Sequence, residues 1–374
     1  MASLFKIDKE VFMEERDLVK IAKRENNKKR GYLVVNPLQG KHIPVSSTKA
    51  LEVFSQLGSL LKQYDRGSTL LVGFAETATA IGAQIAIELG MDYVQTTREN
   101  VEGASYFAFE ESHSHATEQK LVKDRMEKEG KYQQVIFVED EVTTGNTILS
   151  AIDAMEKLGQ RKQKYAVASI LNGMDGEALA RFESKGISVN YLAKTNHSDY
   201  QTIADSYQGN GDYHIAEGKK FAIECINIFY SVDPRRWITG QEYQKVCEKL
   251  WEATKSKVKS GSTLVLGTEE CMYPALYIAK EIEKVTKTTV RCHATTRSPI
   301  MVSKEKEYPL HQRWELPSLY EKDRKTFVYD LTKYDQVLIV TDAENPTEEG
   351  IAALVEALYS VGNENVTLVR WCRK

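Results

Sequence analysis

The chain contains, at residues 135–147, the sequence VIFVEDEVTTGNT. Its first four residues are continuously apolar, as in a strand buried on both faces of a parallel sheet. Two carboxylates, Glu139 and Asp140, end this strand, and a loop rich in hydroxyl groups leads into a helix. Gly145 lets the loop backbone approach an anion closely, and the N–H groups at a helix N-terminus favour one. The segment therefore predicts a phosphate site at the carboxyl end of the strand.

The side chains of the segment also suit a sugar. The hydroxyls of Thr143, Thr144 and Thr147 add hydrogen-bond donors for a phosphate. The two carboxylates can accept hydrogen bonds from vicinal hydroxyls, or hold Mg²⁺ through water, because magnesium keeps much of its hydration shell in proteins. A phosphate cradle beside a diol clamp fits a ribose 5-phosphate. The alternative interpretation is a capped strand–helix turn without a ligand.

Strands and helices alternate on both sides of this segment. Apolar or small-residue runs at 68–74, 93–97 and 165–171 predict further strands. An amphipathic helix is expected from residue 47, and another over 148–158. This alternation predicts a doubly wound α/β fold with a parallel sheet.

The same pattern occurs a second time in the chain. The matching segments, in order, are GSTL at 67–70 and 261–264, QTTR at 95–98 and ATTR at 294–297, and YQQVIFVED at 132–140 and YDQVLIVTD at 334–342. In the loops after the first matched strands, Glu76 falls opposite Glu270. Matches in one order predict a tandem duplication, although any two α/β domains share some strand–glycine–helix grammar.

The second copy lacks the phosphate chemistry of the first. Where the first copy has two acids and Thr-Thr-Gly, residues 341–350 read TDAENPTEEG. One acid and the glycine cradle are missing, and the added glutamates would repel a phosphate. We therefore predict a degenerate second copy that does not bind a phosphoribosyl group in this way.

The composition agrees with a folded chain of two domains. The 374 residues predict two domains at roughly 150 residues each, and a net charge of −3 provides no strong field for nucleic acid or a membrane surface. The apolar runs are too short to span a bilayer, so we expect a cytoplasmic protein. Five cysteines without a Cys-x-x-Cys motif indicate buried free thiols.

Residues 138–147 resemble the motif that binds phosphoribosyl pyrophosphate (PRPP) in type I phosphoribosyltransferases. The resemblance implies a Mg²⁺-dependent enzyme that transfers a phosphoribosyl group between pyrophosphate and a nucleobase-like substrate. It assigns the ribose hydroxyls and Mg²⁺ to Glu139 and Asp140, which would be catalytic. It assigns the 5-phosphate to Thr143, Thr144, Gly145, Asn146 and Thr147.

The resemblance also assigns the pyrophosphate. The loop that would bind it through backbone N–H groups consists of Phe74, Ala75, Glu76 and Thr77. Arg98, after the second strand, would supply a cation.

The long polar segment between residues 98 and 132 contains His113 and His115. The family carries a mobile catalytic loop there, which closes over the substrate and excludes water. Under this interpretation both histidines donate to pyrophosphate oxygens. A His-x-His metal site is a rival interpretation without an evident third ligand nearby, and a plain surface loop is another.

Two positions depart from the family pattern. Purine-using members often have aspartate where Thr143 stands, and that aspartate assists the base, so such a role is in doubt here. Glu141 stands where an apolar residue is usual. It either adds charge near a metal or faces solvent.

Further motifs narrow the resemblance. They are GKHIPV at 40–45, GFAETAT at 73–79, TTRE at 96–99, HSHAT at 113–117 and TRSP at 296–299. Together they look like the phosphoribosyltransferases of tellurite-resistance-linked (Ter) stress operons, in which a TRSP domain follows the transferase. This implies a PRPP-binding domain with a hood over 1–232 and a TRSP domain over 233–374. The second copy could imitate the missing subunit of a dimer; a homodimer and other Ter-operon enzymes are the expected partners.

Two function classes follow from this. The first is a phosphoribosyltransferase whose base pocket lies under a hood formed by residues 36–48 or 195–215. The second is a PRPP-binding regulator or scaffold without catalysis. The near-neutral charge and the absence of a DNA-binding motif argue against a regulator of transcription.

Overall fold

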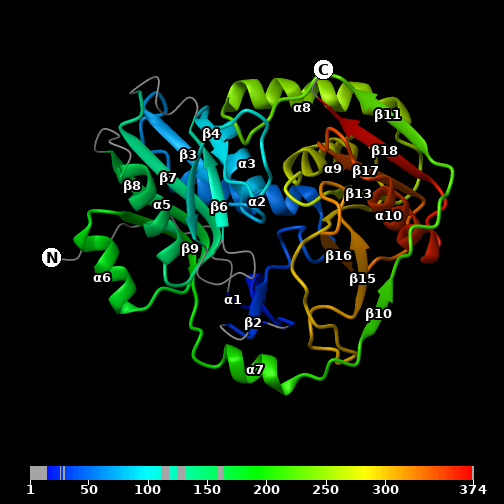
Figure 1. The fold of residues 1–374 in the computed structure, drawn as a ribbon, viewed down its shortest axis with the longest axis horizontal. Helices are drawn as coiled ribbons and strands as arrows, with labels where there is room; N and C mark the ends of the chain where they lie inside the picture. The colour runs from blue at the N-terminus through cyan, green and yellow to red at the C-terminus, as the bar shows by residue number, and fades with distance from the viewer. Residues whose placement is uncertain are drawn as a thin grey trace.

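The computed structural model describes residues 15–25, 27, 30–110, 118–123, 131–157 and 163–372. Within these residues, two large sheets lie side by side, one from each half of the chain (Figure 1). Helices pack against both sheets. The fold is therefore α/β, as the alternation of strands and helices predicts.

The first sheet is mostly parallel and has the spatial order β12-β4-β3-β7-β8-β9. Its parallel strands are β4 (Asp92–Gln95), β3 (Thr69–Gly73), β7 (Gln134–Val142), β8 (Lys164–Asn172) and β9 (Ser188–Lys194). The short β12 (Ile238–Thr239) pairs antiparallel with β4. β3 is buried at every residue, in keeping with its apolar sequence.

The main helices of this half are α2 (Ser47–Ser59), α3 (Thr79–Leu89), α5 (Asn146–Lys157) and α6 (Gly176–Ser184). Ser46 caps α2 by accepting a hydrogen bond from the Lys49 N–H. Gly90 ends α3 in the left-handed conformation, at φ 65°.

Smaller elements surround the first sheet. They are α1 (Glu15–Leu18), the antiparallel hairpin of β1 (Lys20–Lys23) and β2 (Tyr32–Val35), the antiparallel pair β5 (Tyr106–Glu110) and β6 (Glu118–Val122), and α7 (Tyr200–Ser206). The hairpin β1–β2 contacts α7. This hairpin lines the cavity described below.

The second sheet is entirely parallel and has the order β11-β18-β17-β13-β14. Its strands are β11 (Glu224–Ile228), β18 (Val366–Trp371), β17 (Gln336–Thr341), β13 (Thr263–Gly267) and β14 (Val290–Ala294). The helices of this half are α8 (Gly240–Thr254), the 3₁₀ turn η1 (Lys255–Lys257), α9 (Tyr273–Val285) and α10 (Glu348–Ser360). A small sheet contains β10 (Asp212–Ile215), β15 (Gln312–Pro317) and β16 (Lys325–Tyr329).

The two large sheets share one strand order. Across the first sheet the strands lie in the order β4-β3-β7-β8, and across the second sheet in the order β14-β13-β17-β18. In each set, the strand that comes first in the sequence lies between the second and the third. An antiparallel pair follows the second strand of each set, β5–β6 in one half and β15–β16 in the other. The sequence repeat predicts this common order. That it arose by duplication stays a prediction.

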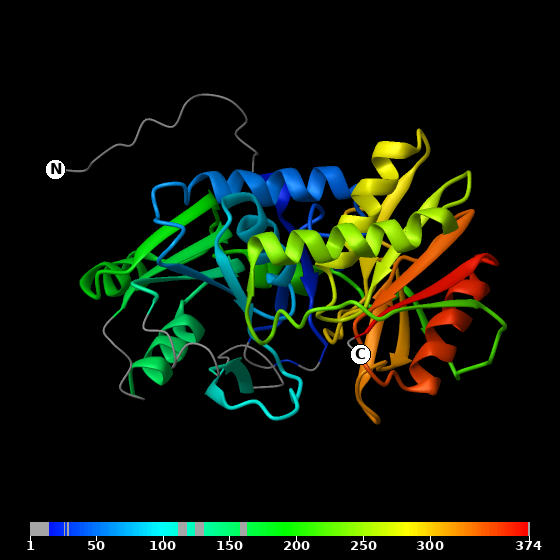
Figure 2. The ribbon, with the colours of Figure 1, turned by 90° about the horizontal axis from the view of Figure 1, so that it is seen from above.

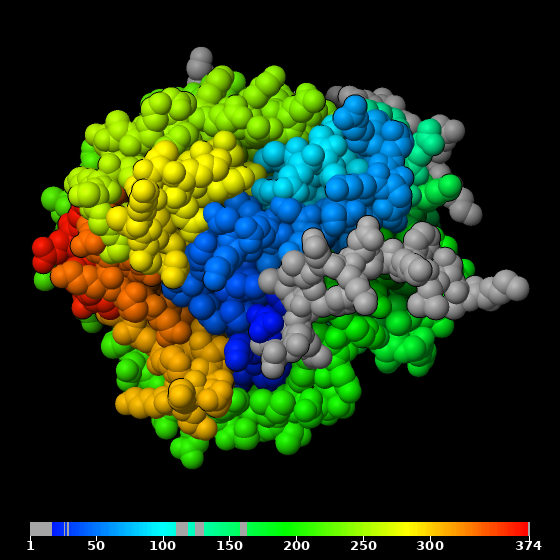
Figure 3. Space-filling model, turned by 180° about the vertical axis from the view of Figure 1, so that it is seen from behind, coloured from blue at the N-terminus to red at the C-terminus, as the bar shows by residue number. Residues whose placement is uncertain are grey.

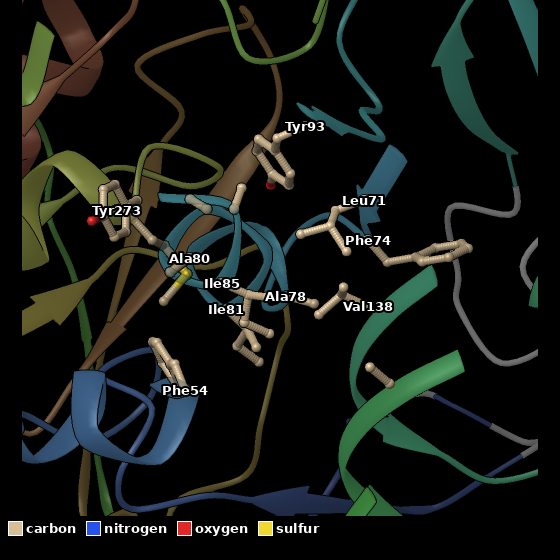
Figure 4. Packing of buried hydrophobic residues seen from close by; sticks show 14 of the residues in the cluster. Phe54, Leu71, Phe74, Ala78, Ala80, Ile81, Ile85, Tyr93, Val138 and Tyr273 are labelled. Carbon is tan, nitrogen blue, oxygen red and sulfur yellow. The ribbon is translucent and has the colours of Figure 1, made fainter. Parts of the chain in front are cut away.

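The halves meet through helices and share one hydrophobic core. α3 contacts α2, α8 and α9, and α2 contacts α9, so their surfaces adjoin (Figures 2 and 3). Phe54, Ile81 and Tyr273, from three of these helices, belong to one buried cluster (Figure 4). The ring of Tyr243 stacks on Tyr93 of the first sheet, at a centroid distance of 6.3 Å.

The segment that links the halves contains β10, β11 and β12, and it pairs with strands of both halves. β10 and β11 pair with strands of the C-terminal half, whereas β12 pairs with β4 of the first sheet. The division into residues 1–232 and 233–374 stays a prediction. In the described part of the chain, the helices lack the length and apolar character that crossing a membrane requires.

Candidate active site

A cavity of about 360 Å³ lies where β3 and β7 end. Its size is that of a small-molecule site. Segments distant in sequence line it: residues 139–148, the loop residues Ala75, Glu76 and Thr77, Arg98 and Gln119, residues of the N-terminal hairpin with His42, and, from the C-terminal half, Glu270, Arg297, Ser298, Pro299, Arg324 and Lys325. The cavity thus brings together most of the residues singled out from the sequence.

The phosphate-binding segment predicted from the sequence surrounds the start of α5. Thr143, Thr144, Gly145, Asn146 and Thr147 all line the cavity. Gly145 has φ +70°, and its carbonyl accepts the Leu149 N–H in the first helical turn. The N–H groups at the start of a helix and the helix dipole favour an anion in the cavity.

The two carboxylates that end the strand, Glu139 and Asp140, also line the cavity. Burial, together with the neighbouring charge of Glu141, raises the pKa of Asp140 to about 6. A bound cation would favour the ionised form of this carboxylate. The expected Mg²⁺ fits here, because magnesium needs only one or two protein carboxylates when substrate phosphates and water complete its shell. The described residues contain no cluster of three or more His, Cys, Asp and Glu side chains that could hold a metal by themselves.

Glu141 forms a link that the sequence does not reveal. Its carboxylate accepts a hydrogen bond from the Arg30 guanidinium at 2.7 Å and lies 3.4 Å from Nε2 of His197. Arg30 in turn lies over the Tyr32 ring, whose hydroxyl is 2.7 Å from Nδ1 of His197. Glu141 therefore does not simply face solvent, because it joins the end of β7 to the N-terminal hairpin.

The loop after β3 is held by polar contacts. The Ala75 N–H donates to the Thr96 hydroxyl at 2.8 Å, and the Gln119 amide donates to the Ala75 carbonyl at 2.7 Å. The peptide bond between Ala75 and Glu76 is cis. Ala75, Glu76 and Thr77 line the cavity, and their assignment to pyrophosphate stays a prediction.

Phe74 lies elsewhere. Its ring is buried against Phe109 and Phe137, and its N–H donates to the Val138 carbonyl. Its backbone donor is thus used within the fold, and the cavity does not include this residue among its walls. The predicted contact of Phe74 with pyrophosphate receives no support from this arrangement.

Glu76 is enclosed by cations. Burial alone would raise the pKa of its carboxyl, but Lys41 and Arg297 hold this pKa below its ordinary value. The Lys41 ammonium lies 3.3 Å from a Glu76 oxygen and is almost fully buried. The loop that is predicted to bind pyrophosphate through its backbone N–H groups therefore also carries the Glu76 side chain, which contacts Arg297 of the C-terminal half.

Arg98 lines the cavity near this loop, and its N–H donates to Glu270 of the C-terminal half at 3.1 Å. His113 and His115 lie outside the described residues, so their assignment to the pyrophosphate stays a prediction. Gln119, which sequence reasoning did not single out, lines the cavity on the same side.

The cavity has more wall residues from the N-terminal hairpin than from the two segments predicted to form a hood, and the hood itself stays a prediction. Of residues 36–48 and 195–215, only His42 lines the cavity, whereas Arg24, Glu25, Asn27 and Arg30 of the N-terminal hairpin do so together. His197 lies behind this hairpin, bonded to Tyr32. The signal available in the sequence was the basic cluster that ends at Arg30, but nothing in its spacing indicates which strand it faces.

Comparison with protein families identifies the chain. Residues 18–196 match the family model described as phosphoribosyl transferase (PRTase_2), and residues 238–358 match the model of the TRSP domain that follows PRTase_2. The chain belongs to the PRTase_2–TRSP family of phosphoribosyltransferases. The first model contains the cavity residues of the N-terminal half, and the second contains Arg297 and Arg324.

Similar solved structures include three adenine phosphoribosyltransferases. The one from Thermoanaerobacter pseudethanolicus is 18% identical, covers 48% of this chain and 97% of its own, and has a TM-score of 0.37. The one from Rhodothermus marinus is 14% identical, covers 48% and 96%, and has a TM-score of 0.37. The one from Giardia lamblia, complexed with 9-deazaadenine, is 16% identical, covers 49% and 96%, and has a TM-score of 0.36. A search of curated protein sequences found no match to this chain.

Proposed function

We propose that this PRTase_2–TRSP protein is a Mg²⁺-dependent enzyme that transfers a phosphoribosyl group between PRPP and a nucleobase-like substrate. One observation carries the proposal: a single cavity unites the acidic end of β7, the phosphate-binding start of α5, the Ala75–Thr77 loop and Arg98. These groups match, in one place, the ribose hydroxyls, the 5-phosphate and the pyrophosphate of PRPP. The resemblance to Ter stress-operon enzymes supports a role in that kind of pathway.

Each group has a distinct task in such a reaction. Glu139 and Asp140 accept hydrogen bonds from the ribose hydroxyls and so orient C1′ for attack by the base nitrogen. Residues 143–147 hold the 5-phosphate through N–H and hydroxyl donors. Magnesium, when bound with PRPP, neutralises charge on the departing pyrophosphate. The protein thus contributes positioning and charge stabilisation rather than covalent chemistry.

Arg98 and the loop at 75–77 receive the leaving pyrophosphate in this proposal. A carbon–nitrogen bond forms at C1′ while the carbon–oxygen bond to pyrophosphate breaks, through an oxocarbenium-like state. The pyrophosphate takes the bonding electron pair, so cationic and N–H donors near its oxygens lower the barrier.

The C-terminal half is proposed to be a degenerate copy without PRPP binding. Asp342, which aligns with Asp140, accepts a hydrogen bond from Arg235 at 2.7 Å and one from the Tyr320 hydroxyl at 2.6 Å. The pKa of the buried Arg235 lies well above its ordinary value: burial opposes its charge, but Asp342, Glu270 and Asp233 outweigh this effect. A guanidinium from the linker thus satisfies the acidic group that a ligand would otherwise meet.

Pyrophosphate release tests the proposed function. The full chain is incubated with Mg²⁺-PRPP and a panel of purine, pyrimidine and related bases, and released pyrophosphate is measured. We expect release that depends on one class of base, abolished by Asp140→Asn and retained by Asp153→Asn on the exposed face of α5. PRPP binding without release for any base would favour the alternative, a non-catalytic PRPP-binding protein.

A further inference from the structure

Each half places one glutamate carboxylate against the backbone and hydroxyl donors of the other half. Glu270 of the C-terminal half accepts hydrogen bonds from the Thr97 hydroxyl at 2.8 Å and the Arg98 N–H at 3.1 Å. Glu76 of the N-terminal half accepts them from the Thr296 hydroxyl at 3.0 Å and the Arg297 N–H at 3.3 Å. The same residue types make the same contacts in both directions.

This reciprocity has the form of a two-fold interface. In such an interface, residue i of one copy contacts residue j of the other, and j contacts i. Glu76 and Glu270 are equivalent in the sequence repeat, as are the Thr-Arg pairs at 97–98 and 296–297. The chain therefore contains, within itself, the contact pattern of a symmetric dimer.

The carboxylate of Glu270 is firmly held. Oε2 accepts from Nε of Arg235 and Oε1 from Nη2 of Arg297, both at 2.9 Å. Burial alone would raise the pKa of this carboxyl, but the two guanidinium groups keep it well below its ordinary range. Glu270 is thus ionised and fixed, a strong acceptor for the Thr97–Arg98 backbone.

Arg98 lines the cavity, and the buried Thr97 directly precedes it. The Thr97 N–H donates to the Lys120 carbonyl, and the Lys120 N–H donates back to Thr97. These bonds fix Thr97 from the N-terminal half, whereas the Arg98 N–H is fixed by Glu270. The backbone position of Arg98, from which its side chain reaches the cavity, is therefore held in part by a residue of the other half.

We propose that Glu270 is a positioning residue for the PRPP site of the N-terminal half, so that the TRSP half permanently supplies what a second subunit would contribute. This inference rests on the proposed function, since it assigns Glu270 to the pyrophosphate end of that site. Glu270 acts through the Thr97–Arg98 backbone and is not assigned a contact with the reacting atoms.

Substitution of Thr97 tests the proposal without leaving a buried charge unpaired. Thr97→Val removes the hydroxyl that donates a hydrogen bond to Glu270, and Thr97→Ser retains this hydroxyl. Glu283→Gln is the matched control, because Glu283 also links the halves, by accepting from Ser47 and Thr48, but does not line the cavity. The readouts are amide hydrogen exchange of residues 96–99 and the Kd of Mg²⁺-PRPP by calorimetry, both on the full chain. The Arg98 amide decides the exchange result because its acceptor is Glu270, whereas the Glu99 N–H donates to the Thr97 hydroxyl at 2.9 Å and loses this acceptor in Thr97→Val in any case.

We expect Thr97→Val to speed exchange of the 96–99 amides and to raise the Kd of Mg²⁺-PRPP roughly tenfold, the effect of one charge-assisted hydrogen bond. Thr97→Ser and Glu283→Gln should keep both values within about twofold of the wild type, on the scale where a tenfold change equals 1.4 kcal/mol. Unchanged exchange in Thr97→Val would overturn the proposal, as would faster exchange with unchanged PRPP affinity.

Failure of the proposed function gives a different result. If the wild-type chain does not bind Mg²⁺-PRPP at all, the phosphoribosyltransferase assignment fails, and the positioning of a PRPP site fails with it. The exchange data then still show whether Glu270 orders residues 96–99. If the wild type binds PRPP and only the exchange result is negative, the assignment stands and the positioning role of Glu270 is wrong.

Discussion

The backbone of Gly145 packs directly against the aromatic ring of Phe182. A Cβ atom at position 145 would lie 2.4 Å from two carbons of that ring, closer than any van der Waals contact allows. Gly145 also has φ +70°, a conformation that residues with a Cβ rarely adopt. Two independent constraints thus require glycine at the turn that leads into α5.

Gly145→Ala is therefore expected to damage both the fold and the site. We expect a loss of about 1–3 kcal/mol in the free energy of unfolding, because the new methyl group clashes with Phe182 in a strained turn. The Kd of Mg²⁺-PRPP should rise at least about tenfold, since a loss of 1.4 kcal/mol in binding has that effect. Thermal unfolding and calorimetry measure the two effects.

Gly176→Ala is the control, since a Cβ at that position meets no atom within 4 Å. It should leave the affinity for PRPP unchanged. The double variant Gly145→Ala/Phe182→Ala separates the two constraints, because it relieves the clash but not the backbone strain. Wild-type affinity in Gly145→Ala would show that this turn does not bind the phosphate.

Asp140→Asn should change stability with a definite pH dependence. The pKa of Asp140 in the folded protein is raised to about 6, above its ordinary value of 3.8. A raised carboxyl pKa stabilises the fold below pH 4, and that contribution is lost as the pH rises from about 4 to 6. At pH 7.5 the ionised carboxylate is thus destabilising, and we expect Asp140→Asn to unfold at a higher temperature than the wild type.

The gain should be at most about 2 kcal/mol, because the carboxyl is only partly buried. It should vanish near pH 4, where both proteins carry a neutral side chain at this position. Unfolding curves at pH 4, 5, 6 and 7.5 measure it, with Asp153→Asn as the exposed control. A gain that does not vary with pH would contradict the raised pKa.

The Arg30–Glu141 pair should control the second substrate rather than PRPP. Arg30→Gln breaks the 2.7 Å contact that holds the N-terminal hairpin to the end of β7. We expect the Kd of Mg²⁺-PRPP to stay within about twofold, and base-dependent pyrophosphate release to fall about tenfold, a loss of 1.4 kcal/mol. Arg66→Gln, at an exposed position, is the control.

A double-mutant cycle with Glu141→Gln tests whether these two side chains act together. If the ion pair is the cause, the loss of release in the double variant should be smaller than the sum of the losses in the two single variants. Strictly additive losses would mean that Arg30 and Glu141 act independently of each other.

The stoichiometry of PRPP binding should be one per chain. Calorimetry of the wild type with Mg²⁺-PRPP tests this directly. Asp342→Asn should leave that stoichiometry and affinity unchanged but lower the free energy of unfolding by about 2 kcal/mol, because it weakens a buried pair with Arg235. Two bound molecules per chain, or loss of binding in Asp342→Asn, would contradict a degenerate second copy.

The N-terminal sheet and its phosphate segment follow from local sequence patterns. Continuous apolar runs produced the buried strands β3 and β7, and the glycine and threonines after β7 produced the turn into α5. The matched runs at 263–267 and 336–341 likewise became β13 and β17 in equivalent places. Such patterns depend only on near neighbours and are visible in one sequence.

Contacts between distant segments were not visible in that way. Arg30 reaches Glu141 across 111 residues, and the Arg98 N–H reaches Glu270 across 172. The sequence pattern around a charged residue on a short hairpin does not indicate which distant residue it will contact. The hood was therefore expected in segment 36–48 or 195–215, and no sequence pattern indicated that Arg24, Glu25, Asn27 and Arg30 would line the cavity.

The shared core of the two halves has a consequence for evolution. Because α2, α3, α8 and α9 pack together within one chain, every N-terminal site meets its partner half at a fixed one-to-one ratio and at an effective concentration independent of expression level. A homodimer must keep both of its identical sites, since one gene encodes both. If the halves arose by the predicted duplication, covalent fusion would remove that coupling, so one copy could lose its ligand chemistry while keeping the surface that packs against the other.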